Sequence, residues 1–290
     1  MKETLSIKLF NTLQKGKEQL GKEALRRVLG FVESQRTTDD TFVNKNGQED
    51  LYYTLFGWML SYTLGLRLQL PKATAYLEKQ QPDDMDLIHY AAYMRCRMLY
   101  RLFKDGKVGY LLNSIFSTSV KALNKFSGLP NNDMFSPYTQ FIYLSLLEDT
   151  RQTVRNKKEF IDALDGYRVA GGGFANLEGS ATATTNATVA ALAVLGQLNG
   201  YKANRDVDCL RGLQEESGGF CATPGAPLPD VLSTATALFV LNAYGMEPIY
   251  SPRDFIEAHW LDSGGFSATL LESVSDVEYT FYGLLILGIL

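Results

Sequence analysis

Two kinds of helical pattern alternate along the C-terminal half of the chain. Residues 231–244 and 280–290 are uncharged and apolar on nearly every face, which is typical of helices that are buried all round. Between them, residues 251–261 place Phe255 and Trp260 at helical spacing among charged residues, as in an amphipathic helix with one exposed face. The alternation predicts a layer of inner helices covered by a layer of outer helices.

These helices belong to a sequence repeat of 46 positions. Ser-Gly-Gly-Phe occurs at residues 217–220 and again at 263–266, and Gly-Gly-Phe occurs at 172–174. The same offset relates Asp230 to Asp276. Each copy consists of a Gly-Gly-Phe turn, a loop of about ten residues and an apolar helix, and repeats of this length indicate stacked helical units.

The N-terminal half carries the same template in weaker form. Residues 50–57 match residues 276–283 at their Asp, Tyr, Thr and Gly positions, and two further candidate units follow. The repeat is clear over residues 165–290 and degenerate over 40–165, and it amounts to six units. Their inner helices are predicted to start near Asp50, Asp86, Ser136, Thr184, Asp230 and Asp276.

Six hairpins in two layers predict an all-α fold, an α/α toroid that occupies residues 1–290 as a single domain. An open solenoid would need polar capping units at its ends. This chain instead ends on the apolar residues 287–290. We therefore expect the ring to close, with the last inner helix covered by the first unit.

The three Gly-Gly-Phe turns, each in register with an apolar helix, resemble the prenyltransferase and squalene-cyclase repeat family. That family includes the β subunit of the protein prenyltransferases and terpene cyclases such as squalene-hopene cyclase. The resemblance implies an α/α toroid that handles an isoprenoid in a central cavity. For the protein prenyltransferases it also implies a partner subunit of the α type.

The resemblance further implies a zinc site, from which this sequence departs. The family's ligands are an Asp, a Cys two residues later and a His in the later repeat. Asp230 matches the Asp, but Leu232 stands at the Cys position and Tyr279 at the His position. Because catalytic zinc takes three protein ligands, we predict no metal site and no cofactor. The loop that carries the family's diphosphate-binding cations, residues 221–228 here, contains no Lys or Arg.

Carboxylates at the predicted helix starts are the first candidates for chemistry. Their repetition favours a structural role as N-caps. The alternative is that they converge at one mouth of the ring, where neighbouring carboxylates raise one another's pKa and supply an acid. Glu278 stands out because it is a carboxylate on an otherwise uncharged helix. On this alternative the candidate catalytic residues are Glu278, Asp230 and Asp276.

Aromatic residues at equivalent positions one turn into the inner helices are the second set of candidates. Such a lining suits an isoprenoid chain, and ordinary core packing is the alternative. The corresponding residues of the fourth and fifth units, Ala187 and Ser233, are small, so the cavity is expected to be lopsided. An arginine in the cavity would replace the missing diphosphate-binding cations, so the candidate ligand-cavity residues are Tyr53, His89, Tyr138, Tyr279 and Arg97.

Other polar residues are predicted to be structural. Asp206-Val207-Asp208 lacks the last Asp of the Asp-x-Asp-Asp acid of terpene cyclases and opens an outer helix, where Asp interacts favourably with the helix dipole. Arg95 is expected to pair with an acid between the two layers. His259 is predicted to lie on the surface of an outer helix.

Composition and charge argue against some classes of partner and location. The net charge is −4 with no basic tract, which argues against nucleic acid. Three cysteines without metal-ligand spacing fit a reducing compartment, and residues 179–201, although uncharged, are too rich in Ser, Thr and Asn for a membrane span. We expect a cytoplasmic protein.

The leading hypothesis for function is therefore a prenyltransferase-like toroid that handles an isoprenoid or other apolar ligand without zinc. One alternative is a non-catalytic binding or scaffold toroid. Another is a toroid enzyme that acts on a carbohydrate through inner-helix carboxylates such as Glu278 and Asp50, because glycosidases use pairs of carboxyl groups.

Overall fold

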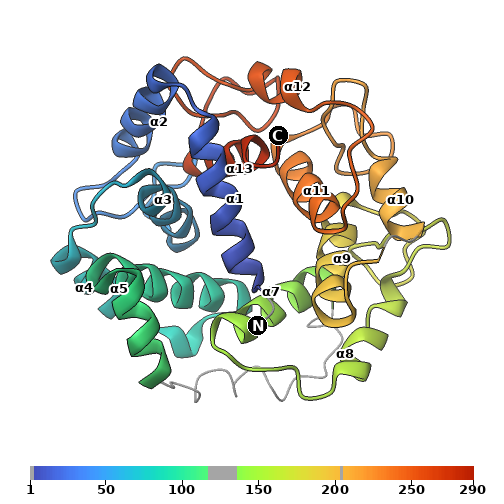
Figure 1. The fold of residues 1–290 in the computed structure, drawn as a ribbon, viewed down its shortest axis with the longest axis horizontal. Helices are drawn as coiled ribbons and strands as arrows, with labels where there is room; N and C mark the ends of the chain where they lie inside the picture. Colours follow the sequence, from blue (N-terminus) through green and yellow to red (C-terminus); the bar gives the residue numbers. More distant parts are fainter. Residues whose placement is uncertain (1–2, 117–135, 203–204) are drawn as a thin grey trace.

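Six helices form a closed ring in the computed structural model, which describes residues 3–116, 136–202 and 205–290 (Figure 1). Each of the six contacts the next along the chain, and the last contacts the first. The expected closed, all-α toroid is confirmed. In ring order the helices are α3 (Leu51–Leu64), α5 (Leu87–Phe116), α7 (Pro137–Asp149), α9 (Thr185–Asn199), α11 (Val231–Ala243) and α13 (Val277–Leu287).

The outer layer consists of helices that each precede an inner helix in the chain and pack against it (Figure 1). Within the described ranges the chain forms isolated β-bridges but no strand. Two short 3-10 helices, η1 (Pro82–Asp84) and η3 (Asp165–Tyr167), lie in the connections. The outer helices are α2 (Lys22–Ser34), α4 (Leu70–Glu78), α8 (Lys157–Asp162), α10 (Arg205–Arg211) and α12 (Arg253–Ala258).

Side-chain caps start all six inner helices at the predicted positions. In each, the cap oxygen accepts a hydrogen bond from the backbone N–H three residues later, as Asp50 does from Tyr53 and Asp276 from Tyr279. A cap of this kind stabilises a helix by about 1 kcal/mol. The six caps are Asp50, Asp86, Ser136, Thr184, Asp230 and Asp276.

A second hydrogen bond recurs between each Gly-Gly-Phe turn and its inner helix. The backbone N–H of Phe220 donates to the hydroxyl of Thr234 over 2.8 Å, and that of Phe266 donates to Thr280 over 3.3 Å. These phenylalanine rings are almost fully buried. The bond satisfies a backbone donor that burial would otherwise leave unpaired, and it fixes the loop that leads to each inner helix.

The first unit has the same turn, which the sequence repeat did not show. Phe42 donates to Thr54 over 3.0 Å, and Asp40 adopts the left-handed conformation with φ of 67°. Glycine stands at this position in the later turns, for example Gly218 with φ of 91°. The buried carboxylate of Asp40 is held by Arg36. An aspartate therefore stands where the later turns have the first glycine of Gly-Gly-Phe, so the first turn lacks that motif.

An additional helix, α1 (Leu5–Gln19), crosses one end of the ring (Figure 1). It packs against α13, α3 and α7. A Cβ atom on Gly16 would lie 2.0 Å from the carbonyl oxygen of Leu284, so the backbones of α1 and α13 touch. The last inner helix is covered by α3 of the first unit, as expected, and also by α1, which was not expected.

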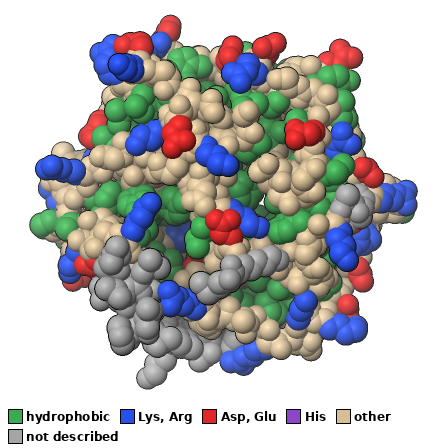
Figure 2. Space-filling model, viewed as in Figure 1, with side chains coloured by type: hydrophobic (Ala, Val, Ile, Leu, Met, Phe, Trp, Pro, Cys, Tyr) green, Lys and Arg blue, Asp and Glu red, His purple; other side chains and the backbone are tan. Residues whose placement is uncertain are grey.

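The polar side chains under α1 satisfy one another at the C-terminal ends of the inner helices. Lys8 Nζ donates to Gln197 Oε1 over 3.2 Å and to the hydroxyl of Tyr201 over 3.0 Å. Gln197 Nε2 in turn donates to Glu148 Oε1 over 2.7 Å. On this face acidic and basic side chains are interspersed (Figure 2). We call this the closed end, and we call the opposite end, where the six inner helices begin, the N-terminal mouth.

Across the described part of the chain, no helix combines the length and the low charge needed to cross a lipid bilayer.

Candidate functional site

Three side chains from different helices converge at the N-terminal mouth. Tyr52, Tyr138 and Glu278 each lie two residues after a cap, on α3, α7 and α13. The hydroxyl of Tyr52 donates to Glu278 Oε1 over 3.2 Å. Although α7 and α13 stand opposite each other in the ring, Glu278 is close enough to raise the pKa of Tyr138, which burial raises most and Arg95 lowers. These three residues form the centre of the mouth.

The convergence corrects the sequence alignment of the third unit. Its cap is Ser136, and the residue that donates to the cap is Thr139 rather than Tyr138. Thr139 is therefore the equivalent of Tyr53 and Tyr279. A shift of one residue turns a side chain by about 100° around a helix. Tyr138 accordingly shares its position with Tyr52 and Glu278.

Glu278 is a half-buried carboxyl that holds its proton more tightly than usual. Burial raises its pKa, and the neighbouring Asp276 raises it further. The hydroxyls of Tyr52 and Tyr53 and the ammonium of Lys45 act in the opposite direction, because they stabilise the charged form. A carboxyl of this kind can both donate and accept a proton.

Asp276 is only partly satisfied by its role as a cap. Its Oδ1 accepts the Tyr279 N–H over 2.8 Å, whereas its Oδ2, in a residue that is 5% exposed, has no hydrogen-bond partner among the described residues. Lys45 Nζ is 3.9 Å away, which is too long for a hydrogen bond. Burial raises the pKa of Asp276 and Lys45 lowers it, so Oδ2 has a distant cation but no hydrogen bond from the described residues.

Aromatic rings continue from the mouth into the ring. Tyr52 meets Phe56 edge to face, with centroids 4.8 Å apart, and Phe56 meets Phe281 at 4.9 Å. Tyr282 lies 5.7 Å from Phe56, and burial raises the pKa of its hydroxyl well above the usual value. These rings come from α3 and α13 alone. One side of the mouth is thus aromatic and apolar behind its polar rim.

The family model of the prenyltransferase alpha-alpha toroid domain matches residues 110–290. The chain belongs to this family. No curated protein matches the chain. The match starts within α5 and so leaves out the first two units, but the bond between Phe42 and Thr54 and the cap at Asp50 show the same construction there.

The residues at the position of the prenyltransferase zinc site do not fit zinc. Both carboxylate oxygens of Asp230 are bound by Ser233, one by its N–H and one by its hydroxyl, each over 2.7 Å. Leu232 offers no ligand atom, and Tyr279 lies beneath Lys45, whose Nζ is 4.8 Å from the ring centroid. Burial raises the pKa of Asp230, and the bonds from Ser233 lower it. Asp230 thus acts as a saturated cap.

Two other candidates lie apart from the convergence of Tyr52, Tyr138 and Glu278. The side chain of His89 is 56% exposed, and its Nδ1 is 2.8 Å from Asp86 Oδ2 of the same helix. The guanidinium of Arg97 lies over the ring of Tyr93 at 5.7 Å. Arg95 pairs with an acid as predicted, but Asp149 belongs to the neighbouring inner helix rather than to the outer layer.

The prediction that His259 lies on the surface is wrong. Its side chain is fully buried, its ring packs 4.1 Å from that of Phe255, and its Nδ1 is 2.7 Å from the Phe255 carbonyl oxygen. Because α12 ends at Ala258, His259 falls in the turn after the helix, where it caps the last carbonyls. Burial lowers its pKa.

The structural role predicted for Asp206 is confirmed. Its buried carboxylate accepts the Gly173 N–H over 2.9 Å and pairs with Arg168. It therefore fixes the Gly-Gly-Phe turn of its unit rather than facing the mouth.

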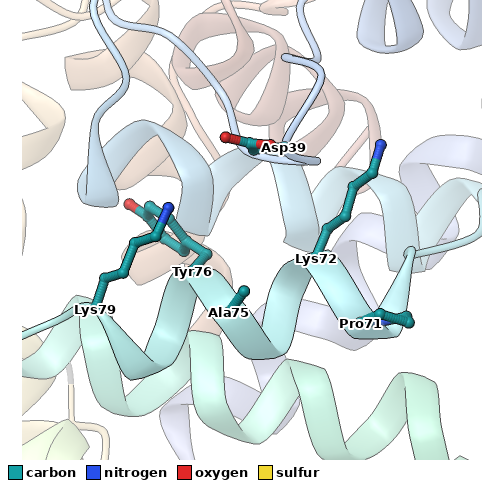
Figure 3. A pocket seen from close by; sticks show the side chains of 6 residues that line it. All are labelled: Asp39, Pro71, Lys72, Ala75, Tyr76 and Lys79. Atoms are coloured by element: carbon teal, nitrogen blue, oxygen red, sulfur yellow. The ribbon is translucent and has the colours of Figure 1, made fainter.

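Two surface pockets lie outside the N-terminal mouth. A pocket of about 220 Å³ on the outer layer contains Lys72 and Lys79 of α4 beside Asp39 (Figure 3). Lys72 donates to the Thr38 carbonyl oxygen over 2.6 Å, so one of these cations has a structural role. A second pocket, of about 410 Å³, lies where the chain closes the ring and is lined mainly by apolar residues, including Leu20, Trp260 and Leu287.

Sequence reasoning missed Tyr52, Tyr282 and Lys45. A signal for the tyrosines was present, because Tyr52 and Tyr282 lie four residues from Phe56 and Glu278 respectively and so share their helix faces. Nothing in the sequence alone places Lys45, which belongs to the loop of the first unit, against the last unit.

Proposed function

We propose that this prenyltransferase-like toroid binds an apolar, isoprenoid-type ligand at the N-terminal mouth and does so without zinc. The observation that carries the proposal is the convergence of Tyr52 and Tyr138 on Glu278, backed by the rings of Phe56 and Phe281. Binding sites for apolar ligands combine aromatic walls with a few polar groups that orient the ligand.

The charges of the mouth favour a ligand without a diphosphate. Residues 221–228, the loop that carries cations in the family, have none. Lys45, a cation at the rim of the mouth, is already paired with Glu272 over 2.9 Å. Asp276 and Glu278 would repel an anionic head group once ionised. We therefore propose binding of the apolar chain itself rather than recognition of a prenyl diphosphate.

Glu278 supports an enzymatic role more than a scaffold role. Burial raises its pKa, and a carboxyl with a raised pKa beside an apolar ligand is suited to act as a general acid. A scaffold toroid would gain nothing from a carboxyl that is costly to bury. Turnover of a bound isoprenoid would separate the two hypotheses.

Two accompanying proposals rest on other grounds. Family membership supports a partner subunit of the α type, and the cysteine pattern supports a cytoplasmic location. Neither follows from the geometry of the mouth.

The test is calorimetric binding of farnesol and farnesyl diphosphate to the wild type and to Tyr279→Ala. We expect the alcohol to bind and the variant to weaken its binding by roughly 1–3 kcal/mol, the scale of losing one buried aromatic contact. Tyr250→Ala is the matched control, because Tyr250 is 40% exposed on the connection between α11 and α12. Tighter binding of the diphosphate than of the alcohol would contradict the proposal.

A further inference from the structure

An ammonium group of the chain already lies at the rim of the N-terminal mouth. Lys45, from the loop of the first unit, reaches across the ring closure to the last unit. Its Nζ lies 2.9 Å from Glu272 Oε2, 3.9 Å from Asp276 Oδ2 and 4.8 Å from the centroid of the Tyr279 ring. Carboxylates beside an aromatic face are the surroundings in which proteins hold ammonium groups.

This internal ammonium does not complete the site. The Lys45 side chain is 43% exposed and its hydrogen bond goes to Glu272, on the solvent side. Asp276 Oδ2, in a side chain that is 7% exposed, is left without a hydrogen bond. Glu278, which is half-buried, receives its hydrogen bond from a neutral tyrosine, Tyr52. An ionised carboxylate that is buried without a cation is costly.

Among the described residues, several tyrosine rings surround Glu278 and Asp276, Lys45 is the cation that acts on both carboxyls, and Arg95 acts on Tyr138. Tyrosines come from three inner helices, and each is close enough for Glu278 to raise its pKa. A ring face attracts a cation through its quadrupole. The tyrosines that surround the two carboxyls are Tyr52, Tyr53, Tyr138 and Tyr279.

We propose that the N-terminal mouth selects an amphiphilic amine, a ligand with an ammonium head on an apolar chain. This inference rests on the proposed apolar-ligand site and names the head group that the site takes. The ammonium would donate to Asp276 Oδ2 and to Glu278, while the chain would lie along the half-buried rings of Tyr52 and Tyr53, which Phe56 supports from within the core. A neutral alcohol would bring no positive charge to the two carboxyls. A diphosphate would be repelled by them once they ionise.

The experiment compares farnesylamine with farnesol and farnesyl diphosphate, three probes with the same chain, by calorimetry at pH 7.5 and below their micelle-forming concentrations. We expect the wild type to bind the amine about tenfold more tightly than the alcohol, the scale of a partly desolvated cation beside aromatic and acidic groups. Binding of the alcohol tests the proposed site, and the ratio of amine to alcohol tests the inference.

Single substitutions test which groups set the ratio of amine affinity to alcohol affinity. Asp276→Asn keeps the cap, since Asn is as good a cap as Asp, and Glu278→Gln keeps the shape of the side chain. Each should weaken the amine more than the alcohol and so bring the ratio of the two affinities towards one. Lys45→Met should tighten the amine, because a competing ammonium is removed. Glu247→Gln, an exposed carboxylate after the C-terminal end of α11, is the matched control and should leave the ratio unchanged.

The outcomes separate the two proposals. An amine that binds no better than the alcohol overturns the inference and leaves the apolar site standing, and so does a ratio that survives both carboxyl variants. A wild type that binds neither probe contradicts both proposals. Tighter binding of the diphosphate would show an anion site that the described residues do not explain.

Discussion

The two ends of the ring treat buried polar groups differently. At the closed end, Lys8, Gln197 and Glu148 hydrogen-bond to one another beneath α1. At the N-terminal mouth, Asp276 keeps one oxygen unpartnered among the described residues, and burial raises the pKa of Glu278. Buried polar groups stabilise a fold when they are fully satisfied. The bonds among Lys8, Gln197 and Glu148 therefore stabilise the closed end, although Thr63 Oγ1 there also lacks a hydrogen-bond partner among the described residues. The carboxyls of the mouth instead lower stability for a property other than folding.

The largest effect is expected where α1 meets α13. A methyl group at residue 16 would lie 2.0 Å from the Leu284 carbonyl oxygen, and two backbones would have to separate. Gly16→Ala should lower the free energy of unfolding by about 3 kcal/mol. Gly30→Ala is the control, since α2 leaves its Cβ position open, and it should stabilise by about 0.5–1 kcal/mol. Equal changes in the free energy of unfolding for the two variants, measured by chemical denaturation, would show that the contact between α1 and α13 does not stabilise the fold.

The polar network of the closed end comes next. Gln197→Ala would take hydrogen bonds from two charged groups, Lys8 of α1 and Glu148 of α7. Such bonds are worth about 1.5–3 kcal/mol each, and their loss leaves charged groups unsatisfied. We expect the free energy of unfolding to fall by about 2 kcal/mol, and thermal melts at fixed pH would measure it. A neutral result would mean that water replaces the amide and that this end is not closed.

A substitution at the N-terminal mouth should raise the stability of the fold rather than lower it. Burial raises the folded-state pKa of Glu278 above its unfolded value, so the folded state binds more protons. Its contribution to stability is fully present below the unfolded pKa of about 4.5 and is lost as pH rises through the folded pKa. Glu278→Gln should therefore be more stable than the wild type at pH 7.5.

Urea melts from pH 4 to pH 8 would follow this difference between wild type and Glu278→Gln. The gap should widen as pH rises, because only the wild type ionises. A variant that is less stable at every pH would show that the Glu278 carboxylate stabilises the fold, and the contrast between the two ends would fail.

The smallest expected effect is the difference in stability between variants of two cap residues, Asp230 and Asp276. Asp230 uses both carboxylate oxygens on Ser233, whereas Asp276 uses one on Tyr279. Asp276→Ala should cost about 1 kcal/mol for the cap, less the relief of removing a buried acid. Asp230→Ala should cost more, because it also leaves the Ser233 hydroxyl without its partner. Chemical denaturation of both variants would rank them, and the reverse order would contradict the description of Asp276 as under-satisfied.

The sequence predicted the inner layer well because its signals are local. A cap and the apolar residues that follow it depend on one helix only, and so all six starts from Asp50 to Asp276 were correct. The turn at Asp40 was missed because an aspartate adopts the backbone conformation that glycine has in the other turns. The role of α1 was missed because Gly16 matters only through its contact with Leu284, which lies far away in the sequence.

The site was harder to predict than the fold, because it depends on which way each side chain points. An error of one residue in the third unit placed Tyr138 beside Tyr53 instead of beside Tyr52 and Glu278. His259 was assigned to the surface because its helix is amphipathic, yet α12 ends one residue earlier and the turn carries the ring inward. Contacts between units, such as that of Lys45 with Glu272, have no signature in a single repeat.

Photo-crosslinking with a farnesol that carries a diazirine on its chain tests the central claim most directly. Mass spectrometry of the labelled protein would locate the bound chain. The account predicts label on the first two turns of α3, α7 and α13, around Tyr52, Tyr138 and Glu278, and its loss with excess farnesol. Label confined to the pocket at the ring closure, around Leu20, Trp260 and Leu287, would contradict the assignment of the N-terminal mouth as the binding site.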